Sequence, residues 1–224
     1  MRQIALLLVL LFALPAFAAT PNTSDPAAHQ RLMNNARRSG DYPSALYHTA
    51  WLTWLAPRKY ADQAEDLLRD RKLLDYCRRS PDGVTTALLA ALDARRARLE
   101  LCLSGKVKSQ APVRQERIAA LLKQAEAAQA QLAAPDPVAR MALADLCLSL
   151  DDVLSLRADP SAKDRRQVLR KAISAAEAVA PTLPDAPGPY RALALARARL
   201  AELDNDPAAW DLAITACAHA LASD

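Results

Sequence analysis

Glycine and phenylalanine are scarce in this 224-residue chain, and their scarcity limits the folds that it can form. The four glycines are too few to build a glycine-rich phosphate loop. Both phenylalanines, Phe12 and Phe17, lie within the first 18 residues, and residues that favour strands are sparse. Leu and Ala dominate, and both are strong helix formers. The composition therefore predicts an all-α fold whose core consists mainly of aliphatic side chains.

Familiar catalytic and metal-binding motifs are missing as well. The chain has no HExxH, GxSxG, CxxC or CxxCH pattern. Its histidines, His29, His48 and His219, are scattered along the chain, and the acidic runs Asp151-Asp152 and 204–206 fall near predicted helix ends, where capping is the expected role. We therefore predict no enzymatic activity, no cofactor and no metal site.

The first 18 residues have the three parts of a secretory signal peptide. Arg2 supplies a positive charge, Ile4 to Leu14 form an apolar run too short to span a bilayer, and Ala16-Phe17-Ala18 fits a cleavage site. We predict cleavage after Ala18 and a periplasmic or secreted protein, with a retained N-terminal anchor as the alternative. Residues 19–25 are expected to be a disordered lead-in, and 26–224 one helical-repeat domain without stable membrane insertion.

Four cysteines remain in the exported part: Cys77, Cys102, Cys147 and Cys217. An even number in an exported protein is compatible with disulfides. The predicted helices, however, place Cys77 and Cys102 about 25 Å apart, given a rise of about 1.5 Å per residue. All four cysteines have apolar neighbours in the sequence. Buried free thiols are therefore the prediction, and disulfides are the alternative.

The formal net charge of +4 does not indicate nucleic-acid binding. A nucleic-acid surface needs a basic stripe that is interleaved with aromatic side chains. Here acidic and basic residues alternate along the predicted helix faces, which is typical of a solvated surface. A protein or peptide partner is the expectation, and no motif specifies its identity.

Glycines and prolines fall at the edges of apolar segments with helical periodicity, so they divide the chain into helices. Proline disrupts a helix interior but is tolerated in the first turn, and Asp136 and Asp206 precede such prolines as expected N-caps. Mostly short connections make neighbouring helices antiparallel. The nine predicted helices span residues 26–39, 42–56, 58–79, 82–104, 113–134, 137–156, 164–180, 188–203 and 207–222.

Residues 26–57 resemble one tetratricopeptide (TPR) repeat. The residues that match the family's inter-helix turn and its later positions are Gly40, Asp41, Tyr42, Ala45 and Pro57. Leu52 and Thr53 depart from the pattern, since the family usually has Ala-Leu there. The resemblance implies a right-handed superhelix of antiparallel helix hairpins that binds a partner. Repeat units of about 40 to 50 residues exceed the family's period of about 34, so we expect an irregular array around 58–79.

Tyr47, Trp51 and Trp54 lie on one stripe of the second predicted helix, and Arg58 follows one turn later. This stripe suits an aromatic shelf for an apolar or glycan ligand, because Trp and Tyr combine apolar area with a polar group. Packing against the third predicted helix is the alternative. Arg96 falls in the apolar register of the fourth predicted helix, where it either reaches the rim or binds a carboxylate in a groove.

The sequence therefore predicts a periplasmic TPR-like interaction scaffold with no chemistry of its own. The alternatives are an all-α enzyme or enzyme accessory of cell-envelope metabolism, and an oligomer that self-associates through its terminal helix. A deep pocket around a buried acid would favour the enzyme. An open concave face lined by the Tyr47 stripe and Arg96 would favour binding, and a broad apolar patch on residues 207–222 would favour self-association.

Overall fold

The computed structural model describes residues 24–79, 82–105, 107–132 and 136–223. These residues are 87% helical and contain no strand, which confirms the predicted all-α fold. The predicted signal peptide and most of the predicted lead-in lie outside the described residues. In chain order, the helices are α2 (Pro26–Ser39), α3 (Tyr42–Leu55), α4 (Pro57–Arg69), α5 (Arg71–Arg79), α6 (Gly83–Leu103), α7 (Val107–Ala130), α8 (Pro137–Ser155), α9 (Ala162–Glu177), a 3-10 helix (Ala180–Thr182), α10 (Pro187–Asp204) and α11 (Pro207–Ser223).

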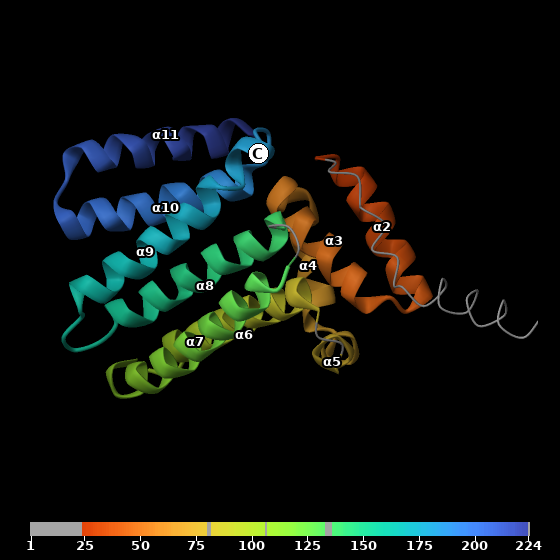
Figure 1. Ribbon diagram of the computed structural model, residues 1–224, viewed down its shortest axis with the longest axis horizontal. Coiled ribbons are helices and arrows are strands. Elements are labelled where there is room, and N and C mark those ends of the chain that lie inside the picture. Colours follow the sequence, from red (N-terminus) through yellow and green to blue (C-terminus); the bar gives the residue numbers. More distant parts are fainter. Residues whose placement is uncertain (1–23, 80–81, 106, 133–135, 224) are drawn as a thin grey trace, which may run out of the picture.

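Helices that are neighbours in the sequence pack in pairs, and the pairs lie side by side (Figure 1). The pairs are α2 with α3, α6 with α7, α8 with α9 and α10 with α11. Contacts of α6 with α8 and of α9 with α10 join successive pairs. This arrangement is the predicted array of helix hairpins. None of the described helices is both long and apolar enough to cross a bilayer.

The turn between α2 and α3 forms as the sequence predicts. Gly40 has a φ of +77°, a left-handed conformation that glycine adopts without steric cost. The Gly40 N–H donates to the Arg37 carbonyl at 3.3 Å, and the Asp41 N–H donates to the Ala36 carbonyl at 2.9 Å, which closes α2. The Asp41 carboxylate then accepts the Ser44 N–H at 3.2 Å and begins α3. The local chemistry of these residues therefore sets the first hairpin.

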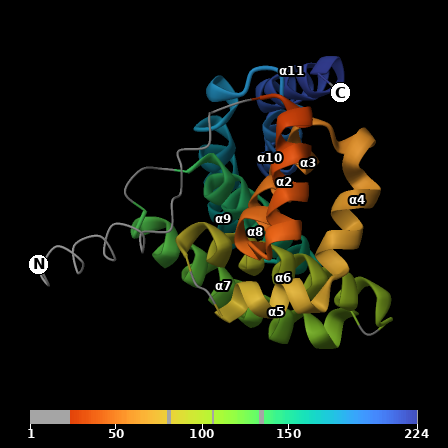
Figure 2. The same cartoon turned by 90° about the vertical axis from the view of Figure 1, so that its right-hand side faces the viewer.

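The prediction of a single helix over 58–79 is wrong, because the chain forms α4 and α5, which run in different directions (Figure 2). The break lies at Asp70, whose backbone is extended at φ −69° and ψ 100°. Its carboxylate accepts the backbone N–H groups of Lys72 at 3.0 Å and Leu73 at 3.2 Å. Such side-chain bonds offer the backbone an alternative to helical bonds. The apolar periodicity continues across this break and therefore does not reveal it.

Helix α7 also differs from its predicted bounds of 113–134. It begins at Val107 and contains Pro112. The first four N–H groups of a helix have no partner within it, so a proline at the sixth residue removes one hydrogen bond close to the terminus. The helix ends at Ala130, whereas predicted residue 134 lies outside the described residues. Proline near a helix start was therefore a misleading boundary marker.

Helix α3 departs from a serial stack, because it also contacts α6, α8 and α10. It lies tightly against Gly188 in the first turn of α10. A Cβ atom added at Gly188 would lie 2.6 Å from Trp54 Cβ and 2.8 Å from Trp54 Cα. Only glycine permits this approach of the two helices. Residues of the first hairpin thereby pack directly against the last hairpin.

Replacing Gly188 by alanine should lower the free energy of unfolding by about 2 kcal/mol, because the added methyl group overpacks the α3–α10 contact. Urea denaturation followed by circular dichroism measures the change. A glycine-to-alanine change inside a helix ordinarily raises stability by up to about 1 kcal/mol. An unchanged or increased unfolding free energy would therefore contradict the close approach.

Candidate functional site

A cavity of about 780 Å³ lies among α3, α6, α8, α10 and α11. Cavities that bind ligands have volumes of about 300 to 1,000 Å³ and mostly apolar walls with a few polar groups. Here the walls include Trp54 of α3, Leu92 of α6 and Met141 of α8, together with aliphatic residues of α10 and α11. Helices from all four packed pairs therefore contribute to the walls of this cavity.

Helix α11 contributes one apolar face to this cavity. Trp210, Ile214 and Leu221 line it at helical spacing, and all three are exposed. The main contact of α11 is with α10 alone, so the rest of this face is not covered within the part of the chain that the structure describes. Contiguous exposed apolar surface of this kind marks sites of interaction.

Three arginines and one aspartate also line the cavity: Arg95 and Arg98 on α6, Arg191 on α10 and Asp145 on α8. Arg98 Nη1 donates to Asp152 Oδ2 at 2.7 Å. Arg95 and Arg191 form no ion pair or hydrogen bond within residues 24–79, 82–105, 107–132 and 136–223. Two guanidinium groups of the cavity are therefore not held by a direct contact with the described protein.

Asp145 is the one acidic residue among the described residues that line the cavity. The surrounding protein raises the pKa of its carboxyl, whereas the charges of Arg95, Arg191 and Arg98 act in the opposite direction. The residue is nevertheless exposed within the cavity, so water reaches it and desolvation is incomplete. The cavity thus combines apolar walls with a cluster of charges in which positive groups outnumber negative ones.

An ion-pair network holds the helices that carry these charges. Asp151 is 1% exposed and accepts Arg165 Nε at 2.8 Å and Arg199 Nη1 at 3.2 Å. Arg199 Nη2 also lies 2.7 Å from Asp152 Oδ1, and Asp152 in turn accepts from Arg98. The network links α6, α8, α9 and α10. The expected capping role of Asp151-Asp152 is therefore wrong, because both residues lie within α8 and bind arginines.

The family of the chain is not evident from similarity. Comparison with protein-family models, curated proteins and solved structures finds no match.

The predicted aromatic stripe lies mainly inside the protein. Trp51 is 3% exposed and stacks on His29 with ring centroids 4.9 Å apart. The Tyr47 O–H donates to Asp136 Oδ2 at 3.4 Å. Trp54 is also buried, but it lines the cavity. Of the three aromatic residues proposed as a shelf, the structure brings only Trp54 to the candidate site.

The two predicted arginine sites, Arg58 and Arg96, are exposed and do not line the cavity. Arg96 Nη1 lies 4.0 Å from Asp93 Oδ1 on the outer side of α6. Its neighbours Arg95 and Arg98 take the groove position that we predicted for Arg96. The exposed position of Arg96 agrees with the other possibility that we considered, in which its side chain extends to the solvent-exposed rim.

Sequence reasoning missed Arg95 because two registers fitted α6 equally well. Arg95 lies seven residues after Leu88 and three after Leu92, whereas Arg96 lies eight and four residues after them. Both spacings are helical. Asp145 and Arg191 were missed for another reason: each is a single charge among apolar residues, and only the packing of α8 near α10 shows that they face the same cavity.

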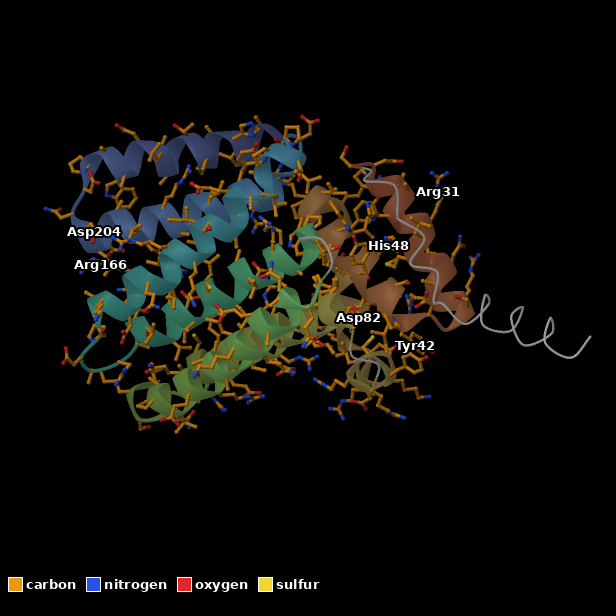
Figure 3. The ribbon with its side chains drawn as sticks, viewed as in Figure 1. Arg31, Tyr42, His48, Asp82, Arg166 and Asp204 are labelled. Carbon is orange, nitrogen blue, oxygen red and sulfur yellow. The ribbon has the colours of Figure 1, made fainter. Side chains whose placement is uncertain are left out.

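His29 and His48 meet between α2 and α3, although we predicted that the histidines are scattered. Figure 3 labels His48. Their Nδ1 atoms are 2.9 Å apart, and both residues are buried. One ring must donate and the other must accept, so the contact requires a neutral histidine. Burial, followed by the charge of His29, lowers the pKa of His48 to about 4, while Asp41 acts in the opposite direction. Among the described residues, no cluster of three His, Cys, Asp or Glu side chains could hold a metal ion.

All four cysteines are free thiols. The prediction of burial is right for Cys77 and Cys147 and wrong for Cys102 and Cys217, which are exposed. Burial raises the pKa of Cys77 to about 11 and that of Cys147 to about 12. Thiolates are the reactive form of cysteine, so these two thiols are inert near neutral pH.

Proposed function

We propose that the protein is an exported, TPR-like interaction scaffold that binds an apolar segment of a partner protein in the cavity and has no chemistry of its own. The supporting observation is the exposed apolar face of α11, which lines the cavity together with residues of α3 and α6. Self-association through the terminal helix would use the same face, and a wild-type dimer that Ile214→Asp dissociates would identify it. Covering such surface is favourable by about 25 cal/mol per Å² of apolar area. Export to the periplasm or the medium rests on the leader pattern of residues 1–18.

Replacing Ile214 by aspartate should reduce capture of the partner at least tenfold, because it puts a charge into the apolar contact. Leu212→Asp is the matched control: Leu212 lies two residues away on α11, is 55% exposed against 62% for Ile214, and does not line the cavity. The measurement is a cross-linking pull-down from the cell envelope of the source organism, with both variants checked by circular dichroism. Equal capture by wild type and Ile214→Asp, or equal loss in both variants, would contradict a cavity-bound partner.

Asp145 supports a second candidate, the enzyme or enzyme accessory of cell-envelope metabolism. It is an acid in a cavity, and the surrounding protein raises its pKa, as general acids often require. Hydrolases of glycosidic bonds usually pair two carboxyl groups across the cleaved bond. No second acid and no histidine occurs among the described residues that line this cavity. Release of soluble fragments from purified peptidoglycan by the wild-type protein would favour the enzyme over the scaffold.

A further inference from the structure

The charged groups of the cavity lie between apolar regions along its length. On α8, Asp145 is placed between Met141 and Leu148, and all three line the cavity. On α10, Arg191 is placed between Gly188 and Leu195 in the same way. The apolar face of α11 follows this length over roughly 16 Å from Trp210 to Leu221, at about 1.5 Å per residue. A ligand that fills the cavity therefore contacts an apolar region, then the charged groups, and then a second apolar region.

The charge in the middle of the cavity is positive. Three arginines stand against Asp145, and the network that holds Arg98 also contains more arginines than aspartates. Of the three cavity arginines, only Arg98 has an ion pair or hydrogen bond with the described part of the chain, and Arg95 and Arg191 have none. A guanidinium group binds a carboxylate through charge-assisted hydrogen bonds, which are stronger than neutral ones.

We infer that the partner segment is an acidic apolar peptide, in which a Glu or Asp side chain is flanked on both sides by large apolar residues. Its carboxylate binds Arg95 and Arg191, and its flanking residues contact Trp54 and the α11 face. In the free protein, the negative charge of Asp145 offsets part of the positive charge of Arg95 and Arg191. In the complex, the ligand carboxylate offsets more of this positive charge. This inference rests on the proposed function and names the chemistry of the partner.

The position of the charges favours a peptide over a simple anionic amphiphile. An amphiphile has its ionic group at one end, so its site needs apolar wall on only one side of the charge. In this cavity apolar residues lie on both sides of Asp145 and of Arg191. A peptide side chain that projects from the middle of an apolar segment matches that order.

Selection from a displayed library of random dodecapeptides tests the inference with a defined probe. The wild-type protein is the bait, and an excess of the Ile214→Asp protein removes peptides that bind outside the cavity. The selected peptides should be enriched in Asp or Glu flanked by Leu, Ile, Phe or Trp. The strongest peptide should bind at least tenfold more weakly to the Arg95→Gln, Arg191→Gln double variant.

Arg96→Gln is the matched control, because Arg96 is adjacent to Arg95 but does not line the cavity. It should leave peptide binding unchanged. The Arg95→Glu, Arg191→Glu variant should instead select peptides with Lys or Arg in place of the acid. If this charge-reversed protein fails to fold by circular dichroism, the glutamine double variant decides the question.

Other results of the selection would overturn either this inference alone or the proposed function as well. Cavity-dependent peptides without acidic enrichment, or equal weakening by Arg96→Gln, would overturn this inference and leave the proposed function intact. A library that yields no cavity-dependent peptide would overturn both. So would a wild-type dimer that Ile214→Asp dissociates, because a second copy of the chain would then cover the α11 face.

Discussion

Replacing Asp151 by alanine should lower the free energy of unfolding by about 4 kcal/mol, the largest effect of a single substitution that we expect in this chain. The carboxylate is 1% exposed and binds Arg165 and Arg199. Their side chains are only 15% and 20% exposed. Removing Asp151 leaves Arg165 desolvated without its acidic partner and Arg199 with Asp152 alone, and this cost exceeds the net value of the intact pairs.

Urea denaturation at neutral pH measures this change. Asp152→Ala is the matched control: it is the next residue on α8 and also binds two arginines, but its side chain is 23% exposed. Water can replace part of its contacts, so we expect a smaller loss of about 2 kcal/mol. Equal effects of the two substitutions would show that burial at Asp151 does not set the strength of the network.

Acidification from pH 7 to pH 4 should remove about 3 kcal/mol of stability through His48 alone. The pKa of His48 is about 4 in the folded protein, against 6.5 in the unfolded chain. Above pH 6.5 both states are neutral, and the contribution of His48 is fully present. Between pH 6.5 and about 4 the unfolded chain takes up a proton that the folded protein does not, so stability falls with pH. Below about pH 4 the folded state also binds the proton and the loss levels off.

Comparison of wild type with His48→Gln isolates this effect from the carboxylates that titrate in the same range. Urea midpoints at several pH values should fall less steeply in His48→Gln than in wild type. His219→Gln is the control, because His219 is exposed and stacks on Tyr190 of α10 instead of belonging to the His29–His48 pair. A His48→Gln profile that parallels wild type would contradict a buried neutral histidine at this position.

The features that the sequence predicted correctly depend on residues close together in the chain. Gly40 and Asp41 end one helix and begin the next through bonds that span at most five residues. Asp136 and Asp206 cap α8 and α11 in the same local way, as expected. Helix starts and ends could be predicted because capping needs only a few neighbouring residues.

The features that the sequence did not predict depend on contacts between distant residues. His29 and His48 meet only because the first hairpin closes, and Asp151 becomes buried only when Arg165 and Arg199 pack against it. The candidate cavity shows the same limit. Periodicity correctly predicted that α6 has an inward face that includes an arginine. It did not show which one, because Arg95 and Arg96 are adjacent and only Arg95 lines the cavity. Tertiary packing, which periodicity does not encode, decides between such neighbouring registers.

The contacts of α3 with α6, α8 and α10 have a consequence for how the array can come apart. In a linear solenoid each unit touches only its neighbours, so a terminal unit can fray while the others persist. Here α3 of the first hairpin contacts helices of the three later pairs, so unfolding of this hairpin would also remove packing contacts from those helices. We therefore expect the bridged pairs to unfold together, and removal of the first hairpin to destabilise the later ones as well.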